Sequence, residues 1–102
     1  MGVDVILVTE DGERIDGVAD EKNLLHRLLP SVDDPSFVYL GCIDWYGDTV
    51  FNHLQMPRFL TELERLRQSA QGADERTLLF HIADLAHRCR DGVHTYLKFC
   101  GD

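Results

Sequence analysis

Alternating polar and apolar positions predict a β-hairpin at the start of the chain. Residues 3–9 are rich in Val, Ile and Leu, and residues 14–18 alternate polar and apolar side chains. Both patterns are typical of strands. Between them, Asp11 and Gly12 form a pair that favours the positive φ angles of a tight turn.

Three later segments carry apolar residues at helical spacing. The first, residues 21–29, follows Asp20 as an N-cap and ends before Pro30. The second begins at Pro57, a residue well suited to the first position of a helix, and the third spans residues 75–91. We therefore predict three amphipathic helices.

Further strands are predicted around these helices. Residues 37–45 are apolar on both faces near their centre, which is typical of a central strand. A turn at 46–48 and a return strand at 49–52 would complete a second hairpin, and residues 95–100 predict a final strand. The order ββαββααβ indicates a single α+β domain over 1–102, with three helices packed on an antiparallel or mixed sheet.

The charge of the chain is concentrated in its first half. The net charge is −8, and residues 1–51 hold 11 Asp/Glu against 3 Lys/Arg, whereas residues 52–102 hold 7 of each. An acidic surface repels phosphate backbones, so nucleic acid is excluded as a partner. A basic protein or a bound cation would fit it, while the alternative interpretation is that the charge serves solubility alone.

Cysteine usage and the N-terminus predict a cytoplasmic protein. Cys42, Cys89 and Cys100 are odd in number and form no CxxC pair, which argues for free thiols in a reducing compartment. The N-terminus lacks the basic region of a signal peptide. No apolar run approaches the ~20 residues that span a bilayer, so no membrane association is expected.

The densest polar cluster lies within residues 44–55 and is the candidate binding site. Carboxylates, an amide and an imidazole there could bind a cation or polar ligand, or do acid–base chemistry. The alternative is structural, because Asp, Gly and Thr are ordinary turn residues and aromatic side chains can cover the edge of a core. The candidate binding residues are Asp44, Trp45, Tyr46, Asp48, Asn52, His53 and Gln55.

This segment resembles one found in a set of small bacterial proteins, Ile-Asp-x-Tyr-Gly-Asp-Thr-x-Phe-Asn-x-x-Gln. The matching residues are Ile43, Asp44, Tyr46, Gly47, Asp48, Thr49, Phe51, Asn52 and Gln55. The resemblance extends through the following helix to the closing residues 96–102. It implies a shared fold and, since no activity is assigned to that group, no catalytic residue.

No other motif predicts chemistry or a cofactor. His81, His87 and Cys89 point in different directions on the third helix, so a zinc site is not expected. The cysteines lack a family signature for a nucleophile, and there is neither a GxSxG turn nor a glycine-rich phosphate loop.

One side of the third helix lies opposite the side that carries its leucines. Phe80, Ala83 and His87 lie there, and if the helix packs only one way, a partner or second copy could cover Phe80. The face containing Phe80 is therefore a candidate homodimer interface. The alternative is a helix sandwiched between the sheet and the C-terminal segment, which the sequence favours.

Two functions follow from these observations. The first is a non-enzymatic protein-interaction module that binds a basic protein, with immunity proteins as an analogy. The second is a small-molecule- or cation-binding protein or a hydrolase-type enzyme that uses Asp44, Asp48, Asn52 and His53. The absence of a motif for chemistry favours the first.

Overall fold

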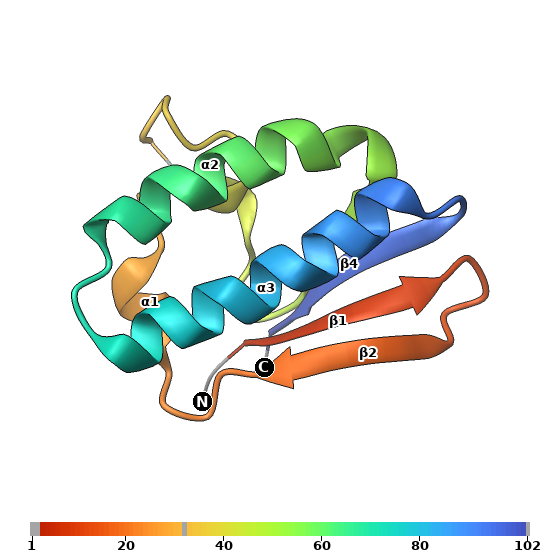
Figure 1. Cartoon of the computed structure of the whole chain (residues 1–102), viewed down its shortest axis with the longest axis horizontal. Coiled ribbons are helices and arrows are strands. Elements are labelled where there is room, and N and C mark those ends of the chain that lie inside the picture. The colour runs from red at the N-terminus through yellow and green to blue at the C-terminus, as the bar shows by residue number, and fades with distance from the viewer. Residues whose placement is uncertain (1–2, 32, 102) are drawn as a thin grey trace.

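A four-stranded antiparallel sheet and two long helices build the fold (Figure 1). The computed structural model describes residues 3–31 and 33–101. The strands are β1 (Asp4–Thr9), β2 (Arg14–Ala19), β3 (Asp48–Asn52) and β4 (Thr95–Cys100); the helices are α1 (Leu24–Leu28), α2 (Met56–Ser69) and α3 (Ala73–Asp91); the short 3-10 helices are η1 (Leu40–Cys42) and η2 (His53–Gln55).

The sheet has the order β2-β1-β4-β3, so β1 and β4 are central and β2 and β3 form its edges. The register aligns Leu7 with Leu97 and Leu97 with Phe51. Because side chains alternate across a strand, this row and its neighbours place apolar residues on one face. The buried residues of that face are Val5, Leu7, Phe51, Leu97 and Phe99.

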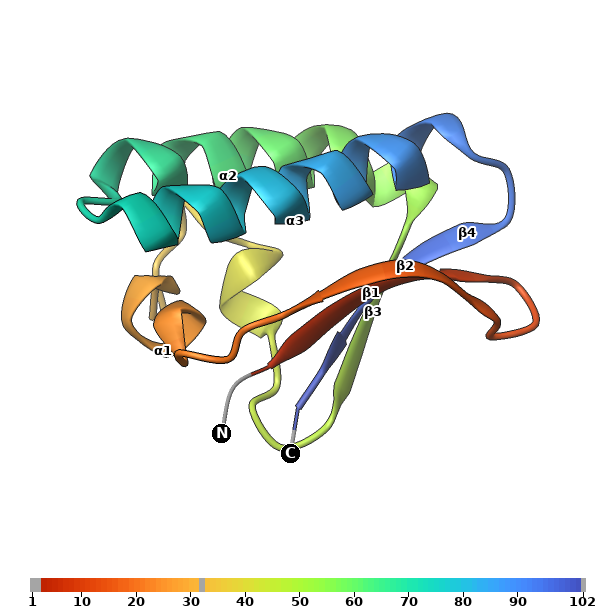
Figure 2. The same ribbon diagram turned by 60° about the horizontal axis from the view of Figure 1, so that its bottom comes forward.

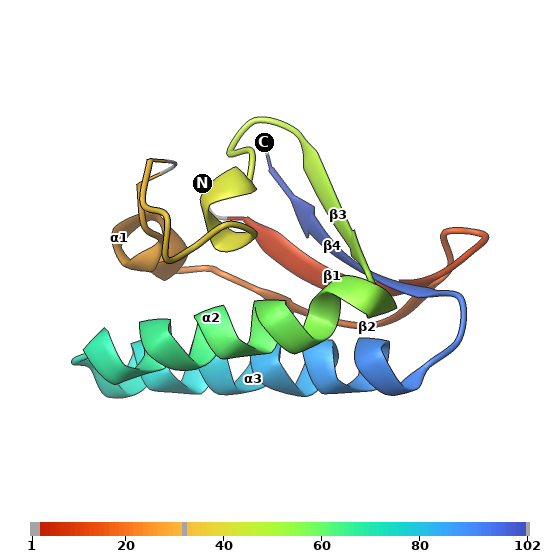
Figure 3. The same cartoon turned by 90° about the horizontal axis from the view of Figure 1, so that it is seen from above.

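Both long helices pack on this apolar face and leave the other face of the sheet open. They run antiparallel to each other and lie together on the same side of the sheet in two different views (Figures 2 and 3). Their buried residues recur at helical spacing, and Phe59 contacts Phe51 and Phe99 with ring centroids 5.4 and 5.9 Å apart. The core therefore lies between the helical pair and one face of the sheet.

The α+β class, the antiparallel sheet and the three helices are confirmed by the structure. The start of α2 and the boundaries of α3 and β4 lie within two residues of those predicted. Helix α1 is shorter than expected, and its N-cap is Asn23 and not the predicted Asp20. The Asp20 carboxylate still serves the first turn, because it accepts hydrogen bonds from the amides of Leu24 and Leu25, both 2.8 Å.

The strand predicted at 37–45 is wrong, and with it the second hairpin. This segment bonds to itself, since the amide of Gly41 donates to the carbonyl of Phe37 and that of Cys42 to Tyr39, at 3.0 Å each. It forms turns and η1 in place of a central strand, and β3 pairs with β4 alone.

A buried glutamate on α2 explains this difference. Glu62 is fully buried although it is a charged residue. Its carboxylate accepts hydrogen bonds from the amides of Val38, Tyr39 and Leu40 at 3.0–3.1 Å, and from Arg58 Nε at 3.3 Å. Because the carboxylate accepts hydrogen bonds from these amides, the segment does not require a neighbouring strand to pair them.

Candidate functional site

The structure divides the predicted 44–55 cluster between the two ends of β3. At the first end, Asp44 holds a turn: its amide donates to Thr49 Oγ1 and its Oδ1 accepts from the amide of Tyr46, both 2.9 Å. Gly101 closes the turn by donating to the carbonyl of Gly47 at 2.7 Å. Asp48 forms an ion pair with Lys98 at 3.3 Å.

At the second end, Asn52 and Gln55 cap η2 reciprocally. The amide of Asn52 donates to Gln55 Oε1 at 2.8 Å, and the amide of Gln55 donates to Asn52 Oδ1 at 3.2 Å. This arrangement is a capping box, which satisfies main-chain donors at the start of a helical segment. His53 follows as the first residue of η2 and is partly buried.

The four residues of the predicted enzyme-like site are therefore not brought together. Asp48 and Asn52 are the two ends of β3, about 13 Å apart at the usual rise of a strand. A shared proton or metal needs its ligands within a few ångströms of one another. In the part of the chain that the structure describes, no three His, Cys, Asp or Glu side chains converge on a possible metal position.

The apolar members of the same segment are arranged differently. Trp45 packs against the core and the ring of His26, with centroids 4.9 Å apart. Tyr46, Val50 and Leu54 are 85%, 52% and 77% exposed. They are three of the seven large apolar side chains that the described residues expose, so exposed apolar surface gathers at β3 and its flanks.

The open face of the sheet adjoins these side chains. Its central row aligns Ile6, Lys98 and Val50, and the next row aligns Val8, Tyr96 and Asn52. No helix of the described residues covers this face (Figure 2). These rows mix apolar side chains with the charged Lys98 and the polar Asn52.

The charge differs between the two layers. The sheet layer, meaning residues 4–19, 44–52 and 95–101, holds seven Asp/Glu and two Lys/Arg, a net charge of −5. The helical layer, residues 56–91, holds six of each, a net charge of zero. The first and second halves of the sequence do not correspond to the two layers, because β4 belongs to the second half of the chain but lies in the sheet layer.

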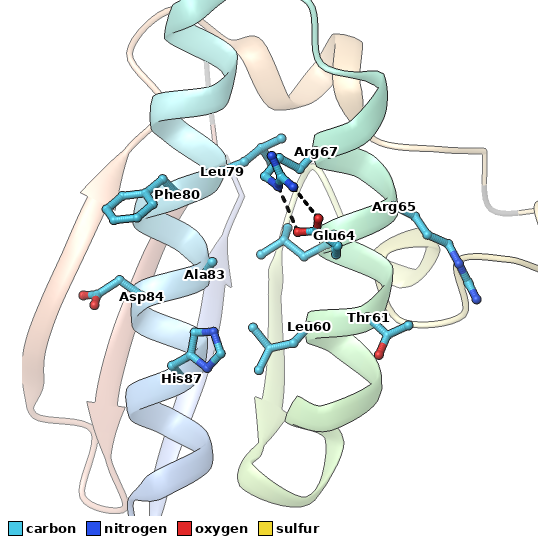
Figure 4. Close-up of a pocket in the computed structure, with 11 residues that line it drawn as sticks. Leu60, Thr61, Glu64, Arg65, Arg67, Leu79, Phe80, Ala83, Asp84 and His87 are labelled. Carbon is cyan, nitrogen blue, oxygen red and sulfur yellow. Dashed lines mark hydrogen bonds and ion pairs between the residues drawn. The ribbon is translucent and has the colours of Figure 1, made fainter.

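A groove of about 660 Å³ lies between α2 and α3 on the side away from the sheet. Figure 4 shows Leu60, Glu64 and Arg67 on α2 facing Leu79, Ala83 and His87 on α3. Glu64 and Arg67 pair with each other across one turn of α2 (Figure 4). The groove is open and mostly apolar at its base.

Phe80 borders the groove and is 70% exposed. The sandwiched arrangement favoured for the third helix is therefore wrong: the C-terminal segment enters the sheet as β4 and leaves the outer side of α3 uncovered. The homodimer through the face containing Phe80 stays a prediction.

The thiols of Cys89 and Cys100 are not activated as nucleophiles. Burial raises the pKa of Cys89 above its ordinary value. Burial, followed by the carboxylate of Asp48, raises the pKa of Cys100. A catalytic thiol requires a shift in the opposite direction.

Comparison of the chain with protein-family models, with curated proteins and with solved structures yields no match. The resemblance of residues 43–55 to small bacterial proteins therefore stays a prediction. Within the described ranges, no helix combines the length and apolar character needed to cross a bilayer.

Proposed function

We propose that this chain is a non-enzymatic protein-interaction module whose partner is a basic protein, bound at the sheet layer. The observation that carries this proposal is the placement of charge: a net −5 on the layer whose sheet face no helix covers, and zero on the helical layer. Complementary charge steers a partner to the acidic layer and orients it there.

The contacts of the candidate cluster favour binding over catalysis. The hydrogen bonds of Asp44, Asn52 and Gln55 are used within turns and caps. The side chains left exposed nearby, Tyr46 and Val50, are apolar or aromatic. Aromatic residues are enriched where proteins bind one another.

The sheet layer also offers carboxylates that are free to meet a basic partner. Asp11 and Glu13 lie in the exposed β1–β2 turn, which extends beyond the helices (Figure 1). A cytoplasmic immunity-like protein that covers a basic toxin is one instance of such a module, by analogy of size and charge.

The test is a pull-down from lysate of the organism that makes the protein, at low and high salt. An Asp11→Asn/Glu13→Gln variant removes two charges from the sheet layer. A matched Glu64→Gln/Asp84→Asn variant removes two from the helical layer. We expect one basic protein to be retained, released by salt and weakened by the first variant alone.

Two outcomes would contradict the proposal. One is retention that salt does not change, since counterions screen charge-driven binding. The other is equal weakening by both variants, which would mean that net charge matters and its placement does not. Far-ultraviolet circular dichroism of both variants confirms that folding is unchanged.

A further inference from the structure

We propose that the outer edge of β3 accepts an extended segment of the basic partner as an added strand of the sheet. The inference rests on the proposed function and specifies how that partner is held. Strand addition gives affinity through main-chain hydrogen bonds, while flanking side chains give specificity.

The pairing of β3 leaves main-chain groups unused at this edge. Hydrogen-bonded and non-hydrogen-bonded pairs alternate along an antiparallel ladder. The amide of Gly101 donates to the carbonyl of Gly47, so the register directs Thr49 and Phe51 toward β4. Asp48 and Val50 therefore turn their amides and carbonyls outward.

The hydrogen bond of the Asn52 amide agrees with this alternation. Asn52, the next outward position, uses its amide to reach Gln55 Oε1 rather than β4. Outside the strand ladders, no main-chain hydrogen bond of Asp48 or Val50 is found in the described ranges 3–31 and 33–101. Two amides and two carbonyls are thus available in a row to an added strand.

The two edges of the sheet are not equally protected. β2 has an irregularity opposite Leu7 and Val8, where its register shifts. Bulges of this kind discourage pairing with another strand. β3 reads Asp-Thr-Val-Phe-Asn, keeps a regular register, and contains none of the proline or lysine that usually guards an edge.

Exposed apolar side chains flank this open edge. Val50 lies on β3 itself, Tyr46 precedes the strand and Leu54 follows it. An added strand alongside β3 would lie next to all three positions. Burial of such side chains supplies affinity that main-chain hydrogen bonds alone do not.

Charge selects a basic segment over a second copy of this chain. Asp44 and Asp48 lie beside the edge, and the sheet layer around it keeps a net charge of −5 with the ion pair between Asp48 and Lys98 included. Pairing β3 with β3 of a second copy would bring two acidic layers together. An extended segment that carries Lys or Arg meets the opposite charge.

The test uses a short peptide of alternating Lys and Val as the probe. Its binding is monitored by the shifts of the protein's amide signals in two-dimensional NMR of the full chain. Peptides of alternating Glu and Val, and a Lys–Val peptide N-methylated at alternate residues, are the controls. We expect the Lys–Val peptide to move the amides of Asp48 and Val50 and to bind at least about tenfold more tightly than either control.

A variant of the edge tests the same geometry from the protein side. Val50→Pro removes an outward amide without removing a bond to β4, and Val50→Thr keeps that amide. We expect about tenfold weaker binding for Val50→Pro and little change for Val50→Thr. The N-methylated peptide decides the question if Val50→Pro does not fold.

The outcomes separate this inference from the proposed function. Binding of the Lys–Val peptide that moves amides of Ile6, Tyr96 or Lys98 but ignores N-methylation would overturn strand addition and leave the acidic interaction module standing. Equal binding of the Glu–Val peptide would overturn both. Absence of binding by the Lys–Val peptide would overturn the edge site, while the pull-down still decides the module.

Discussion

The two faces of the sheet belong to the same strands yet have opposite roles. On the covered face, Leu7, Leu97 and Phe99 are buried beneath α2 and α3. On the open face, Ile6, Lys98 and Val50 stay accessible in part. Successive side chains of each strand point to opposite faces of the sheet. The helices determine which face becomes core and which remains available to a partner.

Charge follows the same division. The helical layer balances its acidic and basic residues, whereas the sheet layer keeps a net charge of −5. Balanced charge suits surfaces that need only solubility, and a single sign suits a surface that attracts a partner.

The largest expected effect comes from the covered face. Phe99→Ala removes a fully buried ring that contacts Phe51 and Phe59, and we expect a loss of about 3–5 kcal/mol in the free energy of unfolding. Val50→Ala, on the open face, should cost less than about 1 kcal/mol. Urea denaturation measures both, and comparable losses would mean that the open face is also core.

The next effect concerns the helical layer and the segment it holds. Glu62→Gln replaces the carboxylate that accepts hydrogen bonds from the amides of Val38, Tyr39 and Leu40 with a neutral amide. We expect the free energy of unfolding to fall by about 2–3 kcal/mol. Glu64→Gln is the matched control and should leave the urea midpoint unchanged, because this side chain is exposed. Equal midpoints for the two variants would show that the amides do not depend on the Glu62 carboxylate.

A smaller effect concerns the outer side of the helical layer. The face containing Phe80 is the predicted homodimer interface, and the helical layer that carries it has zero net charge, which suits contact between two copies. We expect light scattering at two concentrations to give a dimer for the native chain and a monomer for Phe80→Ser. The variant should keep its stability to within about 0.5 kcal/mol. A native monomer at both concentrations would remove the homodimer.

The smallest effect tests an ion pair that joins the layers. Arg88 on α3 donates to Asp16 on β2 at 2.7 Å, and this hydrogen bond, followed by that from the amide of Gly17, lowers the pKa of Asp16. A lowered pKa favours folding above the ordinary pKa of Asp, and that contribution is lost as the pH falls through the lowered value.

Replacing the arginine checks this sign. In Arg88→Gln, the pKa of the Asp16 carboxyl should rise toward its ordinary value, as followed by carbon NMR during a pH titration. The stability difference between native and variant should shrink as the medium becomes more acidic than the native pKa of Asp16. An unchanged Asp16 titration would show that the pair does not form in solution.

Local patterns were sufficient for most elements. Helical spacing of leucines, Pro57 at the start of α2 and Asp20 before α1 predicted three helices that the structure contains. These signals are local, because a cap or an amphipathic stripe depends on residues within a few positions of one another. The first hairpin followed equally from Asp11-Gly12 and the alternation around it.

The candidate cluster could not be predicted correctly from local sequence patterns. Sequence proximity grouped Asp44 and Asp48 with Asn52 and His53, but an extended strand separates the two pairs. A strand moves consecutive residues apart more than a helix does. The signal that could have divided the cluster was the Asn52–Gln55 spacing, which fits a capping box.

The residues alone determined the helices, the first hairpin and the acidic excess, because propensity, turn chemistry and charge belong to short stretches of chain. Tertiary structure decided that 37–45 is not a strand, since the deciding group, Glu62, lies 22 to 24 residues from the amides that it accepts hydrogen bonds from. It also decided which face of the sheet is open and that β3 is an edge. Those properties depend on which strand pairs with which, and no local pattern carries that information.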